Sequence, residues 1–224
     1  MITINNNMYV LDTDNTSYAF AVLGSGQLEH LYYGRKLHAN EAVMTEKHTF
    51  IPGNTNVYNK DYSSYSLEDV CLEMSSLGKG DIREPFIEVT YPNGSSTTDM
   101  VFDRAEIIQG KEEYDTLPGS YDDNGEVEQL VIYLKDRNYN LTLELHYYVY
   151  EKCDIITRSA KLVNSGNESV RLERLMSMQL DLNESDYELS FFNGAWAREM
   201  NRSRIPIRAG KYVNCLLYTS DAAD

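Results

Sequence analysis

The stretch from Leu141 to Tyr150 has the sequence Leu-Thr-Leu-Glu-Leu-His-Tyr-Tyr-Val-Tyr. Successive side chains of a β-strand point to opposite faces of the sheet. Every second residue here, beginning with the first, is apolar or aromatic: Leu141, Leu143, Leu145, Tyr147 and Val149. The residues between them are more polar: Thr142, Glu144, His146, Tyr148 and Tyr150. The pattern predicts a strand with one buried side and one wetter, tyrosine-bearing side.

A second stretch with a period of two lies farther along the chain. Its apolar positions are Val170, Leu172, Met176, Met178, Leu180 and Leu182. Arg174 interrupts the apolar series. The interruption predicts a strand that carries either a β-bulge or an ion-paired, inward-pointing charge at Arg174.

Turn sequences separate the predicted strands. Pro92-Asn93-Gly94 lies between the strands predicted at 87–91 and 100–108. Asn-Gly favours the positive φ angles of a tight hairpin turn, so we expect these two strands to form a hairpin. By the same argument, the turn at 164–167 is predicted to join the strand 155–163 to the strand that begins at Val170.

Three other segments are turn-like or irregular. Asp122-Asp123-Asn124-Gly125 is predicted to open a strand at 127–134. Residues 44–77 are rich in Asn, Ser and Tyr and form a predicted long excursion, which is either a functional loop or a flexible insertion. A tight turn at 78–81 is expected to lead into a strand at 82–89.

The fold class follows from this order of predicted strands and turns. The chain has 224 residues, enough for one large all-β domain or two small ones. About ten to fourteen short strands without a capped helix of ten or more residues predict antiparallel sheets packed as a sandwich. The prediction is therefore an all-β antiparallel β-sandwich.

Charge and hydropathy restrict the partners. The 20 Lys and Arg against 35 Asp and Glu leave a net charge of −15, which counts against nucleic acid and anionic membranes. No stretch approaches the roughly 18 apolar residues that span a bilayer. The amino terminus lacks the basic start and apolar run of a secretory signal, so a cytoplasmic protein is expected.

No cofactor or metal site is expected either. Cys71, Cys153 and Cys215 are far apart and lack the spacing of a disulfide framework or a zinc site. The sequence contains no phosphate-binding glycine loop, nucleophile elbow or zinc-protease motif. The run 181–186 lacks the glycine and glutamate of a calcium loop, and we expect a solvated strand end there.

Acidic pairs could serve a glycosidase in principle. Asp122 and Asp123 lie in a predicted turn, and Glu126 and Glu128 alternate along one exposed strand face. Nothing in that setting raises the proton affinity of a carboxylate. The pairs are therefore predicted to be surface charges.

The segment 191–199 contains the only tryptophan of the chain, Trp196, between two alanines. Planar aromatic rings suit the apolar faces of sugars, and small neighbours let a ligand approach closely. A lone tryptophan beside Phe192 is also typical of a core. Both interpretations, ligand platform and core residue, stay open on residue type alone.

Five motifs together resemble the amino-terminal domain of bacterial α-galactosidases of glycoside hydrolase family 36, over about residues 1–214. They lie, in order, at 32–34, 77–83, 150–159, 175–181 and 194–199, and read Tyr-Tyr-Gly, Leu-Gly-Lys-Gly-Asp-Ile-Arg, Tyr-Glu-Lys-Cys-Asp-Ile-Ile-Thr-Arg-Ser, Leu-Met-Ser-Met-Gln-Leu-Asp and Gly-Ala-Trp-Ala-Arg-Glu. The resemblance implies a β-supersandwich, here incomplete at its carboxy terminus. In this family a (β/α)8 barrel holds the two catalytic aspartates, and this chain contains no counterpart of either.

The resemblance also suggests two substrate-side residues. Trp196 matches the family tryptophan that reaches the galactose pocket in tetrameric members. Lys47 stands in a loop, around 46–48, where relatives supply an acidic residue to a neighbouring subunit's active site. The resemblance thus implies α-galactoside oligosaccharides as ligands, a homotetramer as the assembly, and no catalytic residue within these 224 residues.

The last ten residues, 215–224, match nothing in the family. Codons for Cys-Leu-Leu-Tyr-Thr-Ser-Asp-Ala-Ala-Asp can spell the transposase adapter of a sequencing library. Our hypothesis is that residues 1–214 are a truncated domain and that 215–224 are a translated adapter.

Three functions are compatible with the sequence. The first is an assembly and pocket-wall domain of a retaining α-galactosidase that hydrolyses melibiose- and raffinose-type galactosides. The alternative is a β-sandwich that binds carbohydrate without cleaving it. A purely structural domain with Trp196 in its core is the third and plainest interpretation.

Overall fold

Twelve β-strands and no α-helix lie in the residues that the structure describes, which are 1–38, 57–114, 119–182, 186–208 and 210–213. The coordinates are a computed structural model. Residue contacts divide the chain into two units, Met1–Asp181 and Leu182–Asp224. The predicted all-β class is confirmed. Among the described residues, no helix is long and apolar enough to cross a membrane.

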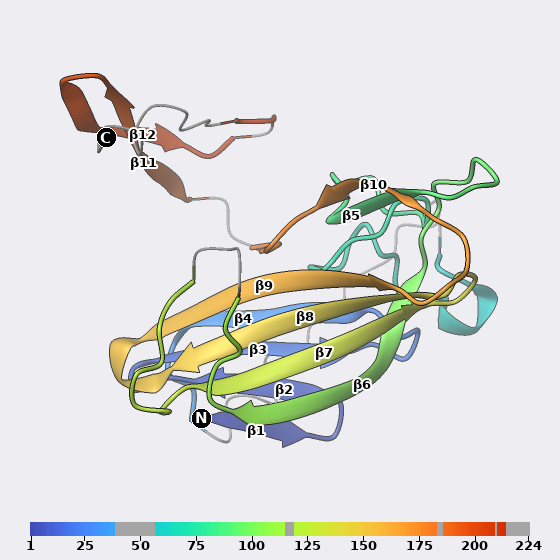
Figure 1. Ribbon diagram of the computed structural model, residues 1–224, viewed down its shortest axis with the longest axis horizontal. Helices are drawn as coiled ribbons and strands as arrows, with labels where there is room; N and C mark the ends of the chain where they lie inside the picture. The colour runs from blue at the N-terminus through green and yellow to red at the C-terminus, as the bar shows by residue number, and fades with distance from the viewer. Residues whose placement is uncertain (39–56, 115–118, 183–185, 209, 214–224) are drawn as a thin grey trace. The chain divides into compact units, whose positions relative to one another are not determined.

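Two four-stranded antiparallel sheets form the body of the first unit. The first sheet has the order β1-β2-β3-β4, with β1 at Ile2–Asn5, β2 at Met8–Asp12, β3 at Thr16–Val22 and β4 at Leu28–Arg35. The second has the order β6-β7-β8-β9, with β6 at Met100–Gln109, β7 at Glu128–Asp136, β8 at Leu141–Tyr150 and β9 at Ile155–Asn164. Figure 1 shows the two sheets stacked as layers, as the predicted sandwich requires.

The core lies between these two layers. Leu11 and Phe20 of the first sheet belong to one buried cluster with Leu130 and Leu145 of the second. Across the interface the Phe20 ring stacks on Tyr147 with ring centroids 5.2 Å apart. Such offset aromatic pairs add about 0.5–1.5 kcal/mol to the burial of the rings themselves.

The strand predicted at Leu141–Tyr150 is confirmed with its expected bounds as β8, and the five residues of its apolar side are buried. Its other side is less exposed to solvent than predicted, because His146 and Tyr148 are buried as well. The Tyr148 hydroxyl lies 2.5 Å from that of Tyr114, and His146 Nδ1 lies 2.9 Å from the Gln129 amide. Side chains from outside β8 therefore cover part of the face that the alternation predicts to be exposed to solvent.

Both predicted hairpins are wrong in their partners, although the turn at Pro92-Asn93-Gly94 is present. The chain reverses at Pro92-Asn93-Gly94, where the Gly94 amide donates to the Tyr91 carbonyl at 2.9 Å. The strands on either side of that turn nevertheless belong to different sheets. β5, at Ile87–Thr90, pairs with β10, at Arg171–Leu175, whereas β6 pairs with β7 and β9 pairs with β8. A turn sequence specifies that the chain reverses, and side-chain burial then decides which strand it joins.

β10 confirms the prediction for Arg174 and corrects the one for its strand. The pairing of β10 with β5 shifts between Leu172 and Arg174, which is the predicted irregularity. The Arg174 guanidinium also pairs with Glu84 at 3.1 Å. The strand ends at Leu175, so the expected continuation through Leu182 does not form.

The irregular segment predicted at 44–77 is confirmed where it is described, from 57 onward. It contains one short 3₁₀ helix at Lys60–Tyr62. Four of its side chains form a small core of their own: Tyr65, Leu67, Val70 and Leu72. The strand expected to begin at Ile82 begins only at Ile87. The turn at Asp122–Gly125 does lead into β7, as predicted.

A carboxylate at the centre of the first unit joins its layers. Glu73 is fully buried, and its Oε1 accepts hydrogen bonds from the Tyr18 hydroxyl at 2.6 Å and His30 Nδ1 at 2.7 Å. Its Oε2 accepts the Tyr147 hydroxyl at 2.8 Å and lies 3.1 Å from the Arg158 guanidinium. Tyr18 and His30 come from the first sheet, and Tyr147 and Arg158 come from the second. Glu73 therefore links three parts of the chain by polar contacts.

The same contacts decide the ionisation of the cluster. Burial alone raises the pKa of Glu73, but the Arg158 charge and the hydrogen bonds from His30 and Tyr18 bring it below the usual value. Burial and the Glu73 charge raise the pKa of Tyr18 well above its usual value. The buried carboxylate is thus held ionised while its tyrosine neighbours stay neutral.

Glu73→Gln removes the charge and leaves Arg158 as an uncompensated buried cation. Breaking a buried ion pair from one side costs about 3–5 kcal/mol. We expect the free energy of unfolding at neutral pH to fall by about that amount in urea titrations followed by far-ultraviolet circular dichroism. Glu168→Gln, on an exposed turn, is the matched control and should change it by less than about 0.5 kcal/mol. Equal stability of the two variants would contradict the role given to Glu73.

Acid should weaken the fold partly through the same carboxylate. Because the folded pKa of Glu73 lies below its unfolded value, the unfolded state binds the proton first as the pH falls. The stabilisation is complete above the unfolded pKa, about 4.3, and is lost as the pH falls through the folded value. We expect the difference in unfolding free energy between the wild-type chain and Glu73→Gln to shrink below about pH 4.5. A difference that stays constant down to pH 3 would count against it.

Candidate functional site

The second unit presents Trp196 at the tip of a two-stranded hairpin. Its strands are β11 at Glu188–Ala195 and β12 at Arg198–Pro206. Ala195 pairs with Arg198, so Trp196 and Ala197 form a two-residue turn. Ala197 has a φ of 56°, a left-handed conformation that a small residue tolerates better than a β-branched one. Ala197, beside Trp196, thus serves the turn.

Trp196 is 90 % exposed. The interpretation of Trp196 as a core residue of this chain is therefore wrong. Its indole presents an open apolar face, the kind of surface that stacks on the C–H face of a pyranose. Lys47, the other sequence-derived site residue, lies outside the described residues together with Glu46 and His48.

The hairpin around Trp196 exposes several large apolar side chains. Exposed large side chains on it include Leu189, Phe192 and Met200. Phe191 packs on Tyr212 with ring centroids 5.3 Å apart. A lone two-stranded hairpin is at best marginally stable in water. Its exposed apolar surface is typical of an element that packs against further protein.

Three of the four acidic residues singled out from the sequence, Asp122, Glu126 and Glu128, are engaged in structural contacts. Asp122 Oδ1 accepts the Glu126 amide at 2.9 Å within its turn. Glu126 pairs with Lys152 at 2.7 Å, and Glu128 accepts the Ile2 amide at 2.7 Å. Asp122, Glu126 and Lys152 line an open cavity of about 700 Å³ together with Asp14. The arrangement fits surface charges, as predicted.

Asp181, expected at a solvated strand end, is instead an anchored residue. Its Oδ2 accepts the Leu72 backbone amide at 3.1 Å and the Gln179 side-chain amide at 3.3 Å. The same oxygen pairs with the guanidinium of Arg83. Three donors on one oxygen hold this carboxylate against the irregular segment of the first unit.

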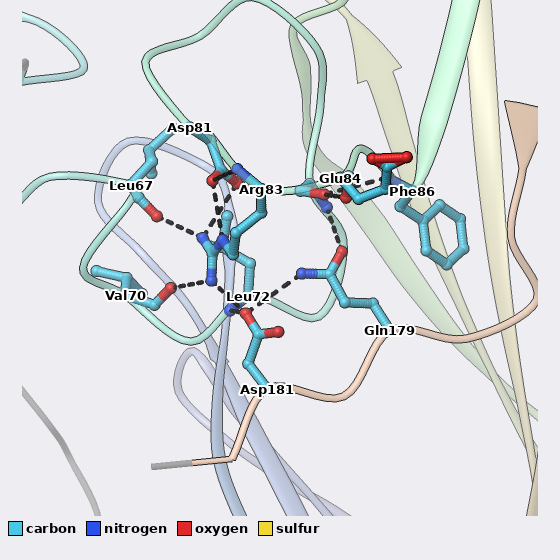
Figure 2. Close-up of polar contacts among 10 residues, drawn as sticks. Leu67, Val70, Leu72, Asp81, Arg83, Glu84, Phe86, Gln179 and Asp181 are labelled. Atoms are coloured by element: carbon cyan, nitrogen blue, oxygen red, sulfur yellow. Dashed lines mark hydrogen bonds and ion pairs between the residues drawn. The ribbon is translucent and has the colours of Figure 1, made fainter. Parts of the chain in front are cut away.

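Arg83 uses every donor it has. Its Nε donates to Asp81 at 2.8 Å, and Nη1 donates to the Val70 carbonyl at 2.7 Å and to Asp181. Nη2 donates to the Leu67 carbonyl and, at 3.1 Å, to Asp81. Figure 2 shows Arg83 between Asp81 and Asp181, with the carbonyls of Leu67 and Val70 turned toward it. A lysine has three donors on one atom and cannot reproduce this fork.

Gln179 connects this cluster with the buried one at Glu73. Its side-chain oxygen accepts the Ser75 amide at 3.0 Å, and its backbone carbonyl accepts Arg158 Nη1 at 2.9 Å. Sequence reasoning missed these anchoring roles of Arg83, Arg158, Gln179 and Asp181. The available signal was their place in the motifs at 77–83, 150–159 and 175–181, which the fold brings together.

A known protein family matches most of this chain. The sequence profile described as "Glycosyl hydrolase family 36 N-terminal domain" matches residues 26–215. The chain belongs to this family. The match covers the second sheet, the polar cluster of Arg83, Gln179 and Asp181, and the Trp196 hairpin. The family 36 resemblance of the five motifs is thereby confirmed.

Curated relatives carry the same family 36 domain within much longer proteins. The chain is 34% identical over 206 residues to "Alpha-galactosidase AgaA" of Geobacillus stearothermophilus, covering 89% of this chain and 27% of that protein. It is 32% identical over 207 residues to "Bifunctional alpha-galactosidase/sucrose kinase AgaSK" of Mediterraneibacter gnavus, covering 92% and 22%. The chain thus spans about a quarter of the length of these relatives.

Solved family 36 structures have the same fold. The α-galactosidase AgaB of Geobacillus stearothermophilus superimposes with a TM-score of 0.87 at 30% identity, over 94% of this chain and 29% of that one. A variant of AgaA from the same organism, solved in complex with raffinose, superimposes with a TM-score of 0.84 at 31% identity, over 91% and 28%.

The anchor makes a prediction that can be tested in this chain. Asp181→Ala removes the acceptor of the Leu72 amide, so hydrogen exchange at Leu72 should accelerate roughly 10- to 100-fold, as expected for a lost bond to a charged group. Exchange measured residue by residue by NMR checks this, and Gln179→Ala should do the same at Ser75. Glu168→Ala is the control and should change neither amide. Unaltered exchange at Leu72 in Asp181→Ala would show that another contact protects it.

Proposed function

We propose that this chain serves as the amino-terminal domain of a retaining α-galactosidase, where it supports assembly and forms part of the pocket wall. The observation that carries the proposal is the family match over 26–215, shared with relatives that are named α-galactosidases. We further propose terminal α-galactosides of the melibiose and raffinose type as substrates. Support comes from AgaA variants solved in complex with raffinose and with stachyose.

The chemistry of this proposed enzyme divides between parts of the protein. A retaining glycosidase needs one carboxylate that forms the glycosyl-enzyme and a second that protonates the leaving oxygen and then activates water. The buried carboxylate of Glu73 is occupied by Arg158, and Asp81 and Asp181 are occupied by Arg83. We therefore assign the catalytic pair to the barrel of the complete enzyme and no catalytic residue to the described part of this chain.

Trp196 is the residue that we assign to the substrate. Its exposed indole on a turn between small neighbours suits stacking against a galactose ring. Lys47 is the second proposed contact and rests on the family resemblance alone. A homotetramer is proposed on the same basis, with the exposed apolar hairpin as its support, and a cytoplasmic location stays a prediction from the sequence.

The alternative function is a carbohydrate-binding sandwich that cleaves nothing. An exposed tryptophan favours it as much as it favours a pocket wall. The two differ in what the complete protein does, because only the first requires a barrel with two catalytic aspartates. Translating the source DNA downstream of Asn214 distinguishes them.

We expect Trp196→Ala to raise the KM of the complete enzyme for raffinose about 5- to 30-fold, the loss of one stacking contact, with a smaller change in kcat. Steady-state kinetics on raffinose and on a chromogenic α-galactoside measure both constants. Tyr121→Ala removes another highly exposed aromatic and is the matched control, with KM unchanged. The 224-residue chain alone should show no turnover. Turnover by that chain, or an unchanged KM in Trp196→Ala, would refute the proposed division of roles.

A further inference from the structure

Three Asn-Gly dipeptides occur in the chain, at Asn93-Gly94, Asn124-Gly125 and Asn193-Gly194. In such a dipeptide the backbone nitrogen of glycine can attack the side-chain amide carbon of asparagine, because glycine has no Cβ that blocks the approach. The ring closure needs rotation about the Cα–C and Cα–Cβ bonds of the asparagine and a glycine N–H that can lose its proton. Hydrogen bonds to either group therefore slow the reaction.

Two of the three asparagines occupy the same place in matching turns. Asn93 and Asn124 are each the third residue of a four-residue turn, and the glycine that follows has a positive φ, 81° at Gly94 and 64° at Gly125. A Cβ built on either glycine would meet nothing within 4 Å. The two turns therefore allow a direct comparison of how firmly the reacting groups are held.

Both reacting groups of the first turn are held. Asn93 Nδ2 donates to the Tyr139 hydroxyl at 3.1 Å, and Asn93 Oδ1 accepts the Ser95 amide at 3.0 Å. The Gly94 amide donates to the Tyr91 carbonyl at 2.9 Å. At least two of these bonds have to open before the Gly94 nitrogen can reach the Asn93 side chain.

The reacting groups of the second turn are held far less. Among the described residues, the Asn124 side chain has no hydrogen-bond partner. The Gly125 amide lies 3.4 Å from the Asp122 carbonyl, beyond the usual range of an N–H···O bond. Asp122 and Gln109 brace this turn through the Glu126 amide and the Gly125 carbonyl, at 2.9 and 2.8 Å, and do not hold the reacting nitrogen. Asn124 also lines the open cavity of about 700 Å³, where water reaches it.

Asn193 is held as well. It lies in β11 and pairs with Asn201 of β12, which fixes its backbone torsions. Its Nδ2 donates to the Ser203 hydroxyl at 3.0 Å. Asn124 is therefore the least restrained of the three asparagines.

Neighbouring carboxylates act in the opposite direction at Asn124. Asp122, Asp123 and Glu126 disfavour the anionic glycine nitrogen that makes the attack. Charges at the protein surface change such an equilibrium by less than about fivefold. The two hydrogen bonds that have to open at Asn93 slow its reaction by roughly 10- to 100-fold. The hydrogen bonds thus decide the order of reactivity.

We propose that Asn124 is a site of spontaneous chemical modification. The Gly125 nitrogen loses its proton and bonds to Asn124 Cγ, the side-chain nitrogen leaves as ammonia, and a succinimide forms. A water molecule then opens the succinimide at either carbonyl and leaves isoaspartate or aspartate at position 124. Both products add a negative charge to the turn that leads into β7, and isoaspartate also adds a backbone atom to it. The isoaspartate is a substrate for the class of methyltransferases that recognise this residue.

The test is incubation of the purified chain at mildly alkaline pH, followed by tryptic digestion and mass spectrometry. Cleavage after Arg and Lys places Asn93 in the peptide 84–104 and Asn124 in the peptide 112–135, and neither peptide contains another asparagine. We expect conversion in 112–135 to be roughly 10- to 100-fold faster than in 84–104. In urea, which removes the bonds that hold Asn93, the two rates should lie within about threefold of each other.

Asn124→Gln and its matched control Asn93→Gln check the assignment with a second readout. A purified isoaspartate methyltransferase and labelled S-adenosylmethionine serve as the probe. After incubation, Asn93→Gln should accept as much methyl as the wild-type chain, and Asn124→Gln less than about a tenth of it. Equal rates in the two peptides without urea would overturn the proposal. So would a preference for 112–135 that persists in urea, or undiminished methylation of Asn124→Gln.

Discussion

The buried ion pair between Glu73 and Arg158 is the interaction on which the rest of the structure depends. Glu73 is fully buried and Arg158 nearly so. The Glu73 oxygens also accept from Tyr18, Tyr147 and His30, and the two terminal nitrogens of Arg158 also donate to tyrosine hydroxyls and backbone carbonyls. A buried pair of this kind is stable only when such extra bonds offset its desolvation. The two sheets must therefore pack in the one register that brings Tyr18 and Tyr147 to the same carboxylate.

The same arginine connects the buried core to a second polar cluster. Arg158 also donates to the Gln179 carbonyl, and Gln179 donates to Asp181, which meets Arg83. Two clusters with separate carboxylates are thus joined by one glutamine. This continuity explains why family motifs from distant parts of the sequence meet in a single region, and it gives that region a structural task distinct from chemistry on the substrate.

How much of the structure can be predicted from the sequence depends on how far apart in the sequence the interacting residues lie. The alternation in Leu141–Tyr150 is local, so it predicts β8 to the residue. The partner of β5 is not local, and the Asn93-Gly94 turn misleads because it encodes only a reversal of the chain. Trp196 could be singled out by residue type and by resemblance. The role of Asp181 could not, because its partner Arg83 lies 98 residues away and no spacing rule connects them.

The pairing of β5 with β10 has a consequence for how the chain is made. The Thr90 hydroxyl of β5 donates to the Glu173 carboxylate of β10, which lies 83 residues farther along the sequence. At about 5–20 residues per second, a ribosome needs roughly 4–17 s to synthesise the chain between them. During that interval Val89, fully buried in the finished fold, lacks its strand partner Leu172. β5 is thus incompletely paired until β10 emerges.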